Sequence, residues 1–206
     1  MSDSGAGRPA TRIEAHTPSP PGPKVPTAED VYTVPLPIVR CLLDLAPRIH
    51  QSGAWWSLGG DLAENMLNVH VRPTEITILT DLAGIDAISG VLSNYRPAPV
   101  AERERRVERD GELDGQRYPI FERSRFTEFT TGGVRVLVHG DYQLKVGEWE
   151  WGDPLFFEPT FMSLAGTSIP LMPLKLKSEM YIMLGWVDRA MLISDAYLRA
   201  HSSTHG

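Results

Sequence analysis

The amino-acid sequence predicts an α/β (α+β) fold, in which a mixed central β-sheet is flanked by helices and preceded by a disordered N-terminal tail. Apolar residues recur at helical spacing in four segments, and short alternating or apolar runs typical of strands lie among them. Three of the helical segments are 37–52, 81–95 and 174–200, and a fourth begins at Asp61. The strand segments are 55–58, 75–78, 126–129 and 134–139. Because helices alternate with strands, the helices are expected to pack against a sheet.

The first 30 residues predict a flexible tail. Six prolines stand there among Ser, Gly and Thr, at positions 9, 18, 20, 21, 23 and 26. Such a segment buries too little apolar surface to offset the entropy lost on ordering. We therefore expect a tail over 1–30, one domain over 31–200, and a frayed C-terminus over 201–206.

The first half of the domain predicts helix, strand, helix, strand and helix. Pro37 suits a first helical position, and Pro47 is expected to kink or end that helix. The strand at 55–58 ends in Gly59-Gly60, and Asp61 is the expected N-cap of the next helix. The strand at 75–78 is followed by the helix over 81–95.

The second half predicts strands and a closing helix. Residues 101–117 are dense in charge, which is typical of a solvated hairpin or helix face. Gly132-Gly133 predicts a hairpin turn between the strands at 126–129 and 134–139. A further strand is expected over 144–151. The long helix at 174–200 is interrupted by Gly185 at a cost of about 1 kcal/mol.

Composition and net charge limit the classes of function that we expect for this protein. The net charge is −6 and the pI is about 5.5, so a general nucleic-acid binder is not expected, because such proteins carry a basic excess. The single cysteine, Cys41, lies in an apolar run and is expected to pack as a small hydrophobe. We expect no membrane span, no secretory signal and a cytoplasmic location.

Two segments resemble the minimal nucleotidyltransferase superfamily. In WWSLGGDLAENMLNVHVRPTEITILTD, a strand ends in Gly-Gly, a helix follows, and an arginine-containing turn leads into a second strand. In IPLMPLKLKSEMYIMLGWVDRAMLISD, a proline-flanked entry leads into a lysine-bearing helix. Both arrangements are similar to the opening and closing parts of that family, and they bracket most of residues 55–195.

The resemblance implies a nucleoside triphosphate (NTP) as ligand and Mg²⁺ as cofactor. In the family, glycine permits the sharp strand-to-helix turn, and the helix N-terminus suits a triphosphate. Acids on neighbouring strands hold two Mg²⁺ ions. The nucleotide-binding residues predicted here are Gly59, Gly60, Asp61, Arg72, Thr77, Arg135, Lys175 and Lys177.

The sequence departs from the family at the metal-binding positions. The Asp-x-Asp pair reads Glu75 and Thr77, and the position aligned to the third acid is Leu137. Alternation along the strand places Arg135, Leu137 and His139 on the face of the site. We expect the Arg135 guanidinium to lie near Glu75, where an Arg–carboxylate pair replaces the cation.

Other residues offer an alternative catalytic site. Glu75, His139 and Asp141 are the candidate catalytic residues, with Glu75 and Asp141 as candidate metal ligands, because His and carboxylates are ordinary ligands. A structural alternative remains open, since Asp141 is equally a turn residue and Asp81 equally a helix N-cap.

Alternating Trp and Glu in EWEW predicts a strand with Trp149 and Trp151 on one face. Core or dimer packing is favoured over base stacking, because tryptophan carries a large apolar area.

Three functions follow. The leading interpretation is a nucleotidyltransferase-like protein with degenerate carboxylates that binds a nucleotide or a partner. The first alternative is an active Mg²⁺-dependent nucleotidyltransferase that moves a nucleotidyl group from an NTP to a hydroxyl. The second is a structural module, and a homo-oligomer is compatible with each.

Overall fold

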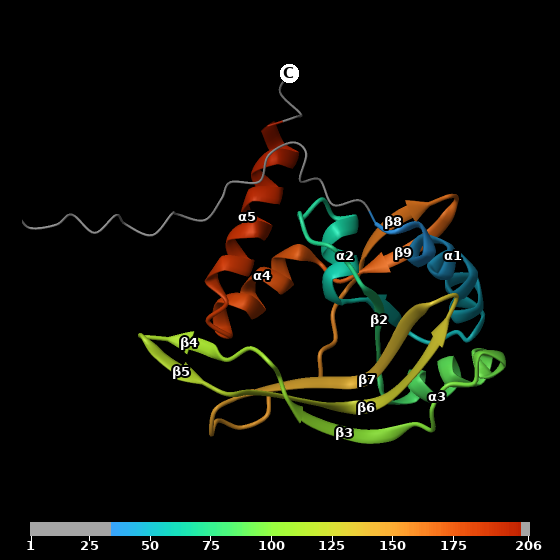
Figure 1. Cartoon of the computed structure of the whole chain (residues 1–206), viewed down its shortest axis with the longest axis horizontal. Coiled ribbons are helices and arrows are strands. Elements are labelled where there is room, and N and C mark those ends of the chain that lie inside the picture. Colours follow the sequence, from blue (N-terminus) through green and yellow to red (C-terminus); the bar gives the residue numbers. More distant parts are fainter. Residues whose placement is uncertain (1–33, 203–206) are drawn as a thin grey trace, which may run out of the picture. The chain divides into compact units, whose positions relative to one another are not determined.

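Seven strands form one mixed sheet in the order β3-β6-β7-β2-β1-β9-β8 (Figure 1). The structure is a computed structural model that describes residues 34–202, with side chains through residue 199. The predicted tail over 1–30 lies outside the described residues, as does most of the predicted frayed C-terminus. The predicted fold class, a mixed sheet flanked by helices, is confirmed.

The element bounds are as follows. The helices are α1 (Leu36–Gln51), α2 (Gly60–Met66), α3 (Leu82–Val91), α4 (Leu174–Met183) and α5 (Val187–Ser202), with a 3-10 turn η2 (Ser93–Tyr95). The strands are β1 (Trp56–Leu58), β2 (Glu75–Thr80), β3 (Ala101–Arg106), β4 (Gly111–Leu113), β5 (Gln116–Tyr118), β6 (Ile120–Thr131), β7 (Val134–Val146), β8 (Thr160–Leu164) and β9 (Thr167–Leu171).

The sheet is mixed because two of its strand pairs are parallel. Strands β2 and β7 run parallel, as do β1 and β9, while the other neighbours in the sheet are antiparallel. Strands β4 and β5 form a separate two-stranded hairpin. The parallel pairing of β2 with β7 sets side by side two strands that are far apart in the sequence.

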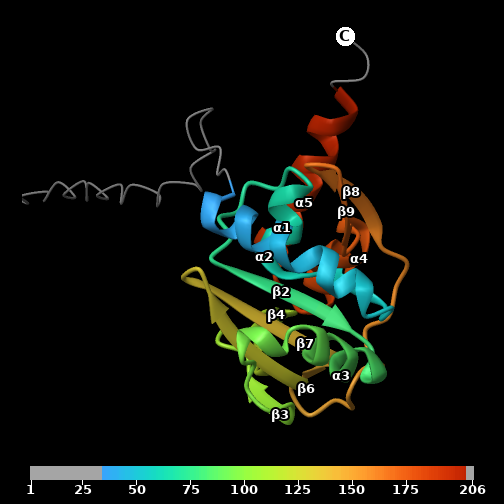
Figure 2. The ribbon, with the colours of Figure 1, turned by 90° about the vertical axis from the view of Figure 1, so that its right-hand side faces the viewer.

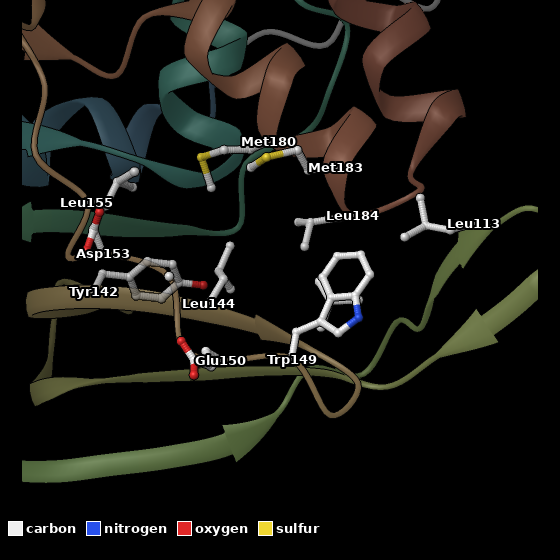
Figure 3. A pocket seen from close by; sticks show the side chains of 12 residues that line it. Leu113, Tyr142, Leu144, Trp149, Glu150, Asp153, Leu155, Met180, Met183 and Leu184 are labelled. Carbon is white, nitrogen blue, oxygen red and sulfur yellow. The ribbon is translucent and has the colours of Figure 1, made fainter.

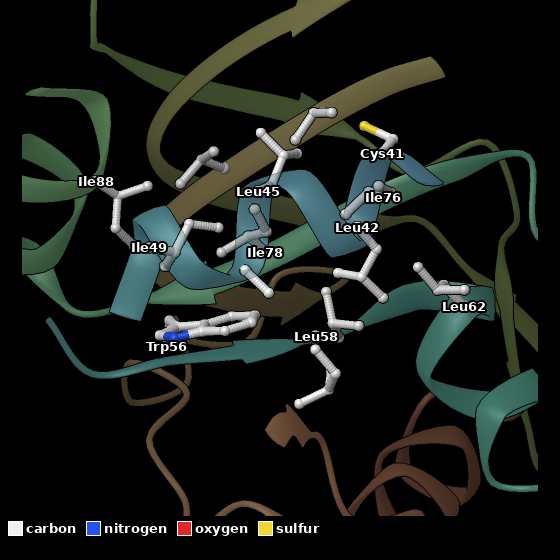
Figure 4. Close-up of a cluster of buried hydrophobic side chains, with 14 of the residues drawn as sticks. Cys41, Leu42, Leu45, Ile49, Trp56, Leu58, Leu62, Ile76, Ile78 and Ile88 are labelled. Atoms are coloured by element: carbon white, nitrogen blue, oxygen red, sulfur yellow. The ribbon is translucent and has the colours of Figure 1, made fainter. Parts of the chain in front are cut away.

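The main core lies between the sheet and helices α1 and α3, which cover the same side of β2 and β7 in Figure 2. Alternate residues of the strands, including Ile76, Ile78 and Val136, are fully buried there. They meet the apolar stripe of α1, whose Leu42 and Leu45 point at the sheet in Figure 4. Because one face of each strand is used for this core, the opposite face is left for a site.

The first half of the domain follows the sequence with two corrections. Pro47 lies inside α1 and does not end it. Asp61 is not the N-cap of α2, because that position belongs to Gly59 and Asp61 lies in the first turn. The alternative interpretation of Asp81 is confirmed, since its carboxylate accepts a hydrogen bond from the Gly84 N–H at 2.6 Å and caps α3. Cys41 is buried, and burial raises the pKa of its thiol to about 11.

The second half differs more. The charge-dense segment forms the edge strand β3 and part of the β4–β5 hairpin, and β6 and β7 are far longer than predicted. The expected strand over 144–151 is wrong beyond Val146, where β7 ends. The hairpin of β8 and β9 was not anticipated, because its strands are short and contain Pro170.

The segment predicted as one closing helix forms two helices, α4 and α5. Gly185 has a φ of +69°, and a Cβ there would lie 2.0 Å from the Glu112 carbonyl oxygen. The left-handed conformation ends α4 and turns the chain into α5, while bringing it against β4. The prediction of one helix over 174–200 was therefore wrong, and the glycine is a boundary.

Within residues 34–202, no helix has both the length and the apolar character needed to cross a bilayer.

Candidate functional site

The candidate site is a cleft of about 210 Å³ on the face of β2 and β7 opposite the main core. Gly60, Glu75, Thr77, Leu137 and His139 all line it. Helix α4 supplies another wall, and Figure 1 shows α4 across from β7. The turn after β1 and the two strands β2 and β7 thus meet at one cleft, as the sequence predicted.

The register of β2 and β7 fixes which side chains share the cleft. Glu75 stands opposite Arg135, and Thr77 stands opposite Leu137. The residues between them, Ile76 and Val136, point into the core. The two strand positions aligned to the second and third acids of the resembled family are therefore neighbours here, and they hold a hydroxyl and an isobutyl group.

Gly60 allows the turn between β1 and α2 to approach β2 closely. Its φ is +60°, and a Cβ at this position would lie 3.0 Å from the Thr77 hydroxyl oxygen. The Gly59 N–H donates to the Thr77 carbonyl at 2.9 Å. Glycine at 60 is thus required both by its backbone conformation and by its proximity to Thr77.

A buried ion cluster connects this turn to α4. The Lys177 ammonium donates at 2.6 Å to the Gly60 carbonyl and lies 2.6 Å from the Glu64 carboxylate. The Tyr181 hydroxyl also donates to Glu64, and Arg189 from α5 pairs with both Asp61 and Glu64. Burial lowers the pKa of Lys177 even though Glu64 opposes that effect, and burial raises the pKa of Tyr181.

The cluster engages two of the predicted nucleotide-binding residues, Lys177 and Asp61. Lys177 lines the cleft but is only 5% exposed, with its ammonium directed to Gly60 and Glu64. Asp61 is paired with Arg189. Both residues therefore hold the turn between β1 and α2 in place, because each is engaged in a contact inside the protein.

Two other predicted ligands do not reach the cleft. The Lys175 side chain is 81% exposed and lies 4.0 Å from Glu179, one turn along α4. Arg72 is an exposed residue of the loop before β2. Neither lines the cleft. The structure therefore does not bring these two residues together with the rest of the predicted set.

Arg135 lies near Glu75, as the sequence predicted, although a second acid binds it more closely. Its Nη1 is 3.5 Å from the Glu75 carboxylate, while its Nη2 is 2.6 Å from the carboxylate of Glu128 on β6. About half of the Arg135 side chain remains exposed. A guanidinium therefore stands beside the one acid that occupies a metal-binding position.

His139 lies inside the sheet face and is only 4% exposed. Its Nδ1 is 3.0 Å from the Ser124 hydroxyl, and its ring contacts those of Phe126 and Tyr142. Burial is the main cause that lowers the pKa of His139 to about 4, with Glu122 opposing it and nearby arginines adding to it. The imidazole is therefore neutral at pH 7, which leaves it unsuited to donate a proton as a general acid.

Asp141 does not join Glu75 and His139, because a β-bulge turns it away. The pairing of β6 with β7 shifts between Arg123 and Arg125, and Asp141 has a φ of +51°. The extra residue resets the alternation, so that Tyr142 lines the cleft while Asp141 lines another hollow with Arg125. Among residues 34–199, no three His, Cys, Asp or Glu side chains could hold a metal. The predicted site of Glu75, His139 and Asp141 is therefore corrected.

Sequence reasoning missed a buried acid in the cleft. Glu122 on β6 accepts from the Arg105 Nε at 2.5 Å and from the Tyr142 hydroxyl at 2.8 Å. Burial, together with the Glu122 carboxylate, raises the pKa of Tyr142 well above its usual value. The predicted strand at 126–129 stopped short of Glu122, so the alternation that places Glu122 beside Ser124 on this face was not followed to its end.

A two-metal site does not fit these residues. The resembled family implies Mg²⁺, which prefers several carboxylate or water oxygens in octahedral geometry. Here the three positions hold Glu75, which is next to a guanidinium, then a threonine and a leucine. Because this donor set lacks the converging acids, no metal-dependent step is derived from it.

Comparison with known proteins supports the fold. No family model matches the sequence, and no curated protein matches it. Among solved structures, the chain is similar to a proposed nucleotidyltransferase from Thermotoga maritima, with 22% identity and a TM-score of 0.58. That match covers 82% of this chain and 97% of the other. The chain therefore has a nucleotidyltransferase-like fold.

A second solved structure is more distant. It is ANT(2")-Ia in complex with adenylyl-2"-tobramycin, with 9% identity and a TM-score of 0.41 over 82% of this chain and 98% of that one. At that TM-score the match carries no argument about this site.

Proposed function

We propose that the chain binds a nucleoside phosphate in the cleft of β2 and β7 without the two-metal chemistry of a nucleotidyl transfer. The observation that carries this proposal is the register of the two strands. Thr77 and Leu137 face each other where acids are needed, and Arg135 lies beside Glu75. A guanidinium thus stands beside the lining acid Glu75 in place of a bound divalent cation, and guanidinium groups bind phosphates directly.

Arg105 is the second group that supports phosphate binding. It donates its Nε–H to Glu122, while 45% of its side chain stays exposed at the cleft. An arginine has five N–H donors, so a guanidinium held through Nε keeps donors for an anion. Glu122 and the Tyr142 hydroxyl fix the orientation of this group, which lowers the entropy lost on binding.

Aromatic rings in the same cleft suit a nucleobase. Tyr142, Tyr181 and Trp186 all contribute to its lining. Stacking of a base on an aromatic ring contributes about 1–3 kcal/mol, and it tolerates any base. The proposed ligand is therefore a nucleotide whose phosphates meet Arg105 in the cleft and extend toward Arg135 beside Glu75.

Calorimetric titration of ATP into the full chain tests this proposal. We expect the same Kd in excess EDTA and in Mg²⁺, because no step depends on a metal. Arg105→Ala is expected to weaken binding at least tenfold, since a charged hydrogen bond contributes about 1.5–3 kcal/mol. The matched control is Arg117→Ala on β5, whose side chain is 80% exposed and does not line the cleft.

The other outcomes decide between the remaining functions. Tight binding that requires Mg²⁺ would contradict the proposal and favour an active nucleotidyltransferase. Absence of ATP binding in both buffers would favour a structural module. Light scattering of the same samples tests the predicted homo-oligomer, because Val187 and Met191 of α5 expose about 60% and 61% of their surface.

A further inference from the structure

A second, larger cavity lies next to the cleft of β2 and β7, for which nucleotide binding is proposed. Its volume is about 490 Å³, within the roughly 300–1,000 Å³ range of small-molecule pockets. Five residues line both spaces, namely Tyr142, Leu144, Leu155, Met180 and Leu184. Figure 3 shows its walls, with methionines from α4 above, β7 below and Leu113 of β4 at one end. The two spaces therefore adjoin each other.

The walls of this cavity are largely apolar. Met180 and Met183 extend from α4, Leu144 extends from β7, and Trp149 turns its indole toward Leu184 in Figure 3. Trp149 and Met183 are 62% and 63% exposed, which is unusual for such large apolar side chains. Methionine is flexible and polarisable, so the side chains of Met180 and Met183 adapt to an apolar ligand body.

The loop that carries Trp149 is held in place by its backbone. After Gly147, whose φ is +54°, the chain folds back along β7. The Gly152 N–H donates to the Leu144 carbonyl at 2.9 Å, and the Leu155 N–H donates to the Tyr142 carbonyl at 2.8 Å. The cavity is thus preformed. Trp149 and Trp151 do not share a strand face as predicted, because Trp151 instead lies under the Arg123 guanidinium.

The charged residues that line the cavity are all acidic. Glu150 and Asp153 of this loop line it, and no lysine, arginine or histidine does so. Neither carboxylate forms an ion pair with another residue of the part of the chain that the structure describes. A ligand amine would be attracted by this negative charge. An anionic ligand would be repelled.

We propose that this cavity binds a small molecule that joins a protonated amine to an aromatic or aliphatic body. The body lies among Leu144, Met180 and Met183, and the amine lies on the side of the loop acids Glu150 and Asp153. This ligand differs in charge from the nucleotide proposed for the adjoining cleft. Because its site has its own lining acids, the inference stands without the proposed nucleotide binding.

An isosteric series of probes tests the inference on the full chain. The probes are 1-naphthylmethylamine, 1-naphthalenemethanol and 1-naphthoate, which share a ring system and differ in charge. Calorimetry in low salt is expected to rank them amine, alcohol, acid, with the amine at least tenfold tighter than the acid. High salt should narrow that ratio, because screening weakens exposed charges.

Variants test separately the acidic part and the apolar part of the site. The double variant Glu150→Gln with Asp153→Asn is expected to weaken the amine at least fivefold and to leave the alcohol unchanged. Met183→Gln is expected to weaken both. The control is Phe161→Gln, which changes an apolar side chain of β8 that is 65% exposed and outside the cavity.

Two results would overturn the inference. One is millimolar or weaker binding of all three probes, and the other is equal binding of the amine and the acid. ATP titration of the same samples separates this failure from failure of the nucleotide proposal, because the variants retain Arg105 and Arg135.

Discussion

At the scale of single residues, the charged side chains in and around the cleft are mainly paired with one another. Lys177, Glu64, Arg189 and Asp61 form one cluster, and Arg105 pairs with Glu122. A buried charge without a partner is costly, whereas a complete pair is close to neutral for stability. The role of the cluster is therefore measured by removing one member, because this leaves its partner buried and unpaired.

Replacement of Lys177 by methionine is expected to destabilise the fold by about 3–5 kcal/mol, because Glu64 then loses its closest cation while remaining buried. Urea unfolding measures the change in free energy. Lys175→Met, on the exposed side of the same helix, is the control and should change stability by less than about 0.5 kcal/mol. Equal effects of the two substitutions would contradict a structural role for Lys177.

His139 predicts a pH dependence of stability. Its pKa is about 4 in the folded chain against 6.5 ordinarily, so between these values the unfolded chain binds the proton and the folded chain does not. The free energy of unfolding therefore falls as the pH falls from 6.5 to 4, by up to about 1.4 kcal/mol per pH unit. Urea unfolding across this range should show a shallower decline in His139→Gln. Parallel curves for the two proteins would refute the assignment.

At the scale of elements, the bulge in β7 decides which side chains reach the cleft. Without it, alternation would place Asp141 beside His139. With it, Tyr142 takes that place and meets Glu122. An extra residue in one strand re-aims every side chain that follows, and such bulges are frequent near functional sites. Gly140, next to the bulge, allows α3 to pack closely, because a Cβ there would lie 3.1 Å from the Ile85 side chain.

Substitutions at Asp141 separate the backbone of the bulge from its chemistry. Asp141→Val is expected to destabilise the fold by about 1–3 kcal/mol, because a β-branched residue tolerates a positive φ poorly. Asp141→Asn should preserve both stability and ATP affinity, since Asn adopts this conformation and the side chain faces another hollow. Loss of ATP binding in Asp141→Asn, measured by calorimetry, would place Asp141 in the site after all.

At the scale of the whole molecule, the sequence predicted the sheet, the location of the cleft and the pair of Arg135 with Glu75. These depend on alternation and on the Gly59-Gly60 turn, which are local properties. The sequence did not predict the role of Lys177, because burial by Tyr181 and Glu64 depends on how α4 and α2 pack. It also did not predict the larger cavity, since a loop after Gly147 rather than a strand places Trp149 there.

The central claim is that the strand positions facing the cleft do not hold a divalent cation. Paramagnetic resonance of Mn²⁺ titrated into the full chain without nucleotide tests it most directly. We predict equal, weak Mn²⁺ binding by the wild type and Glu75→Gln, and binding at least ten times tighter after Thr77→Asp with Leu137→Asp. Tight Mn²⁺ binding by the wild type that Glu75→Gln abolishes would contradict the account.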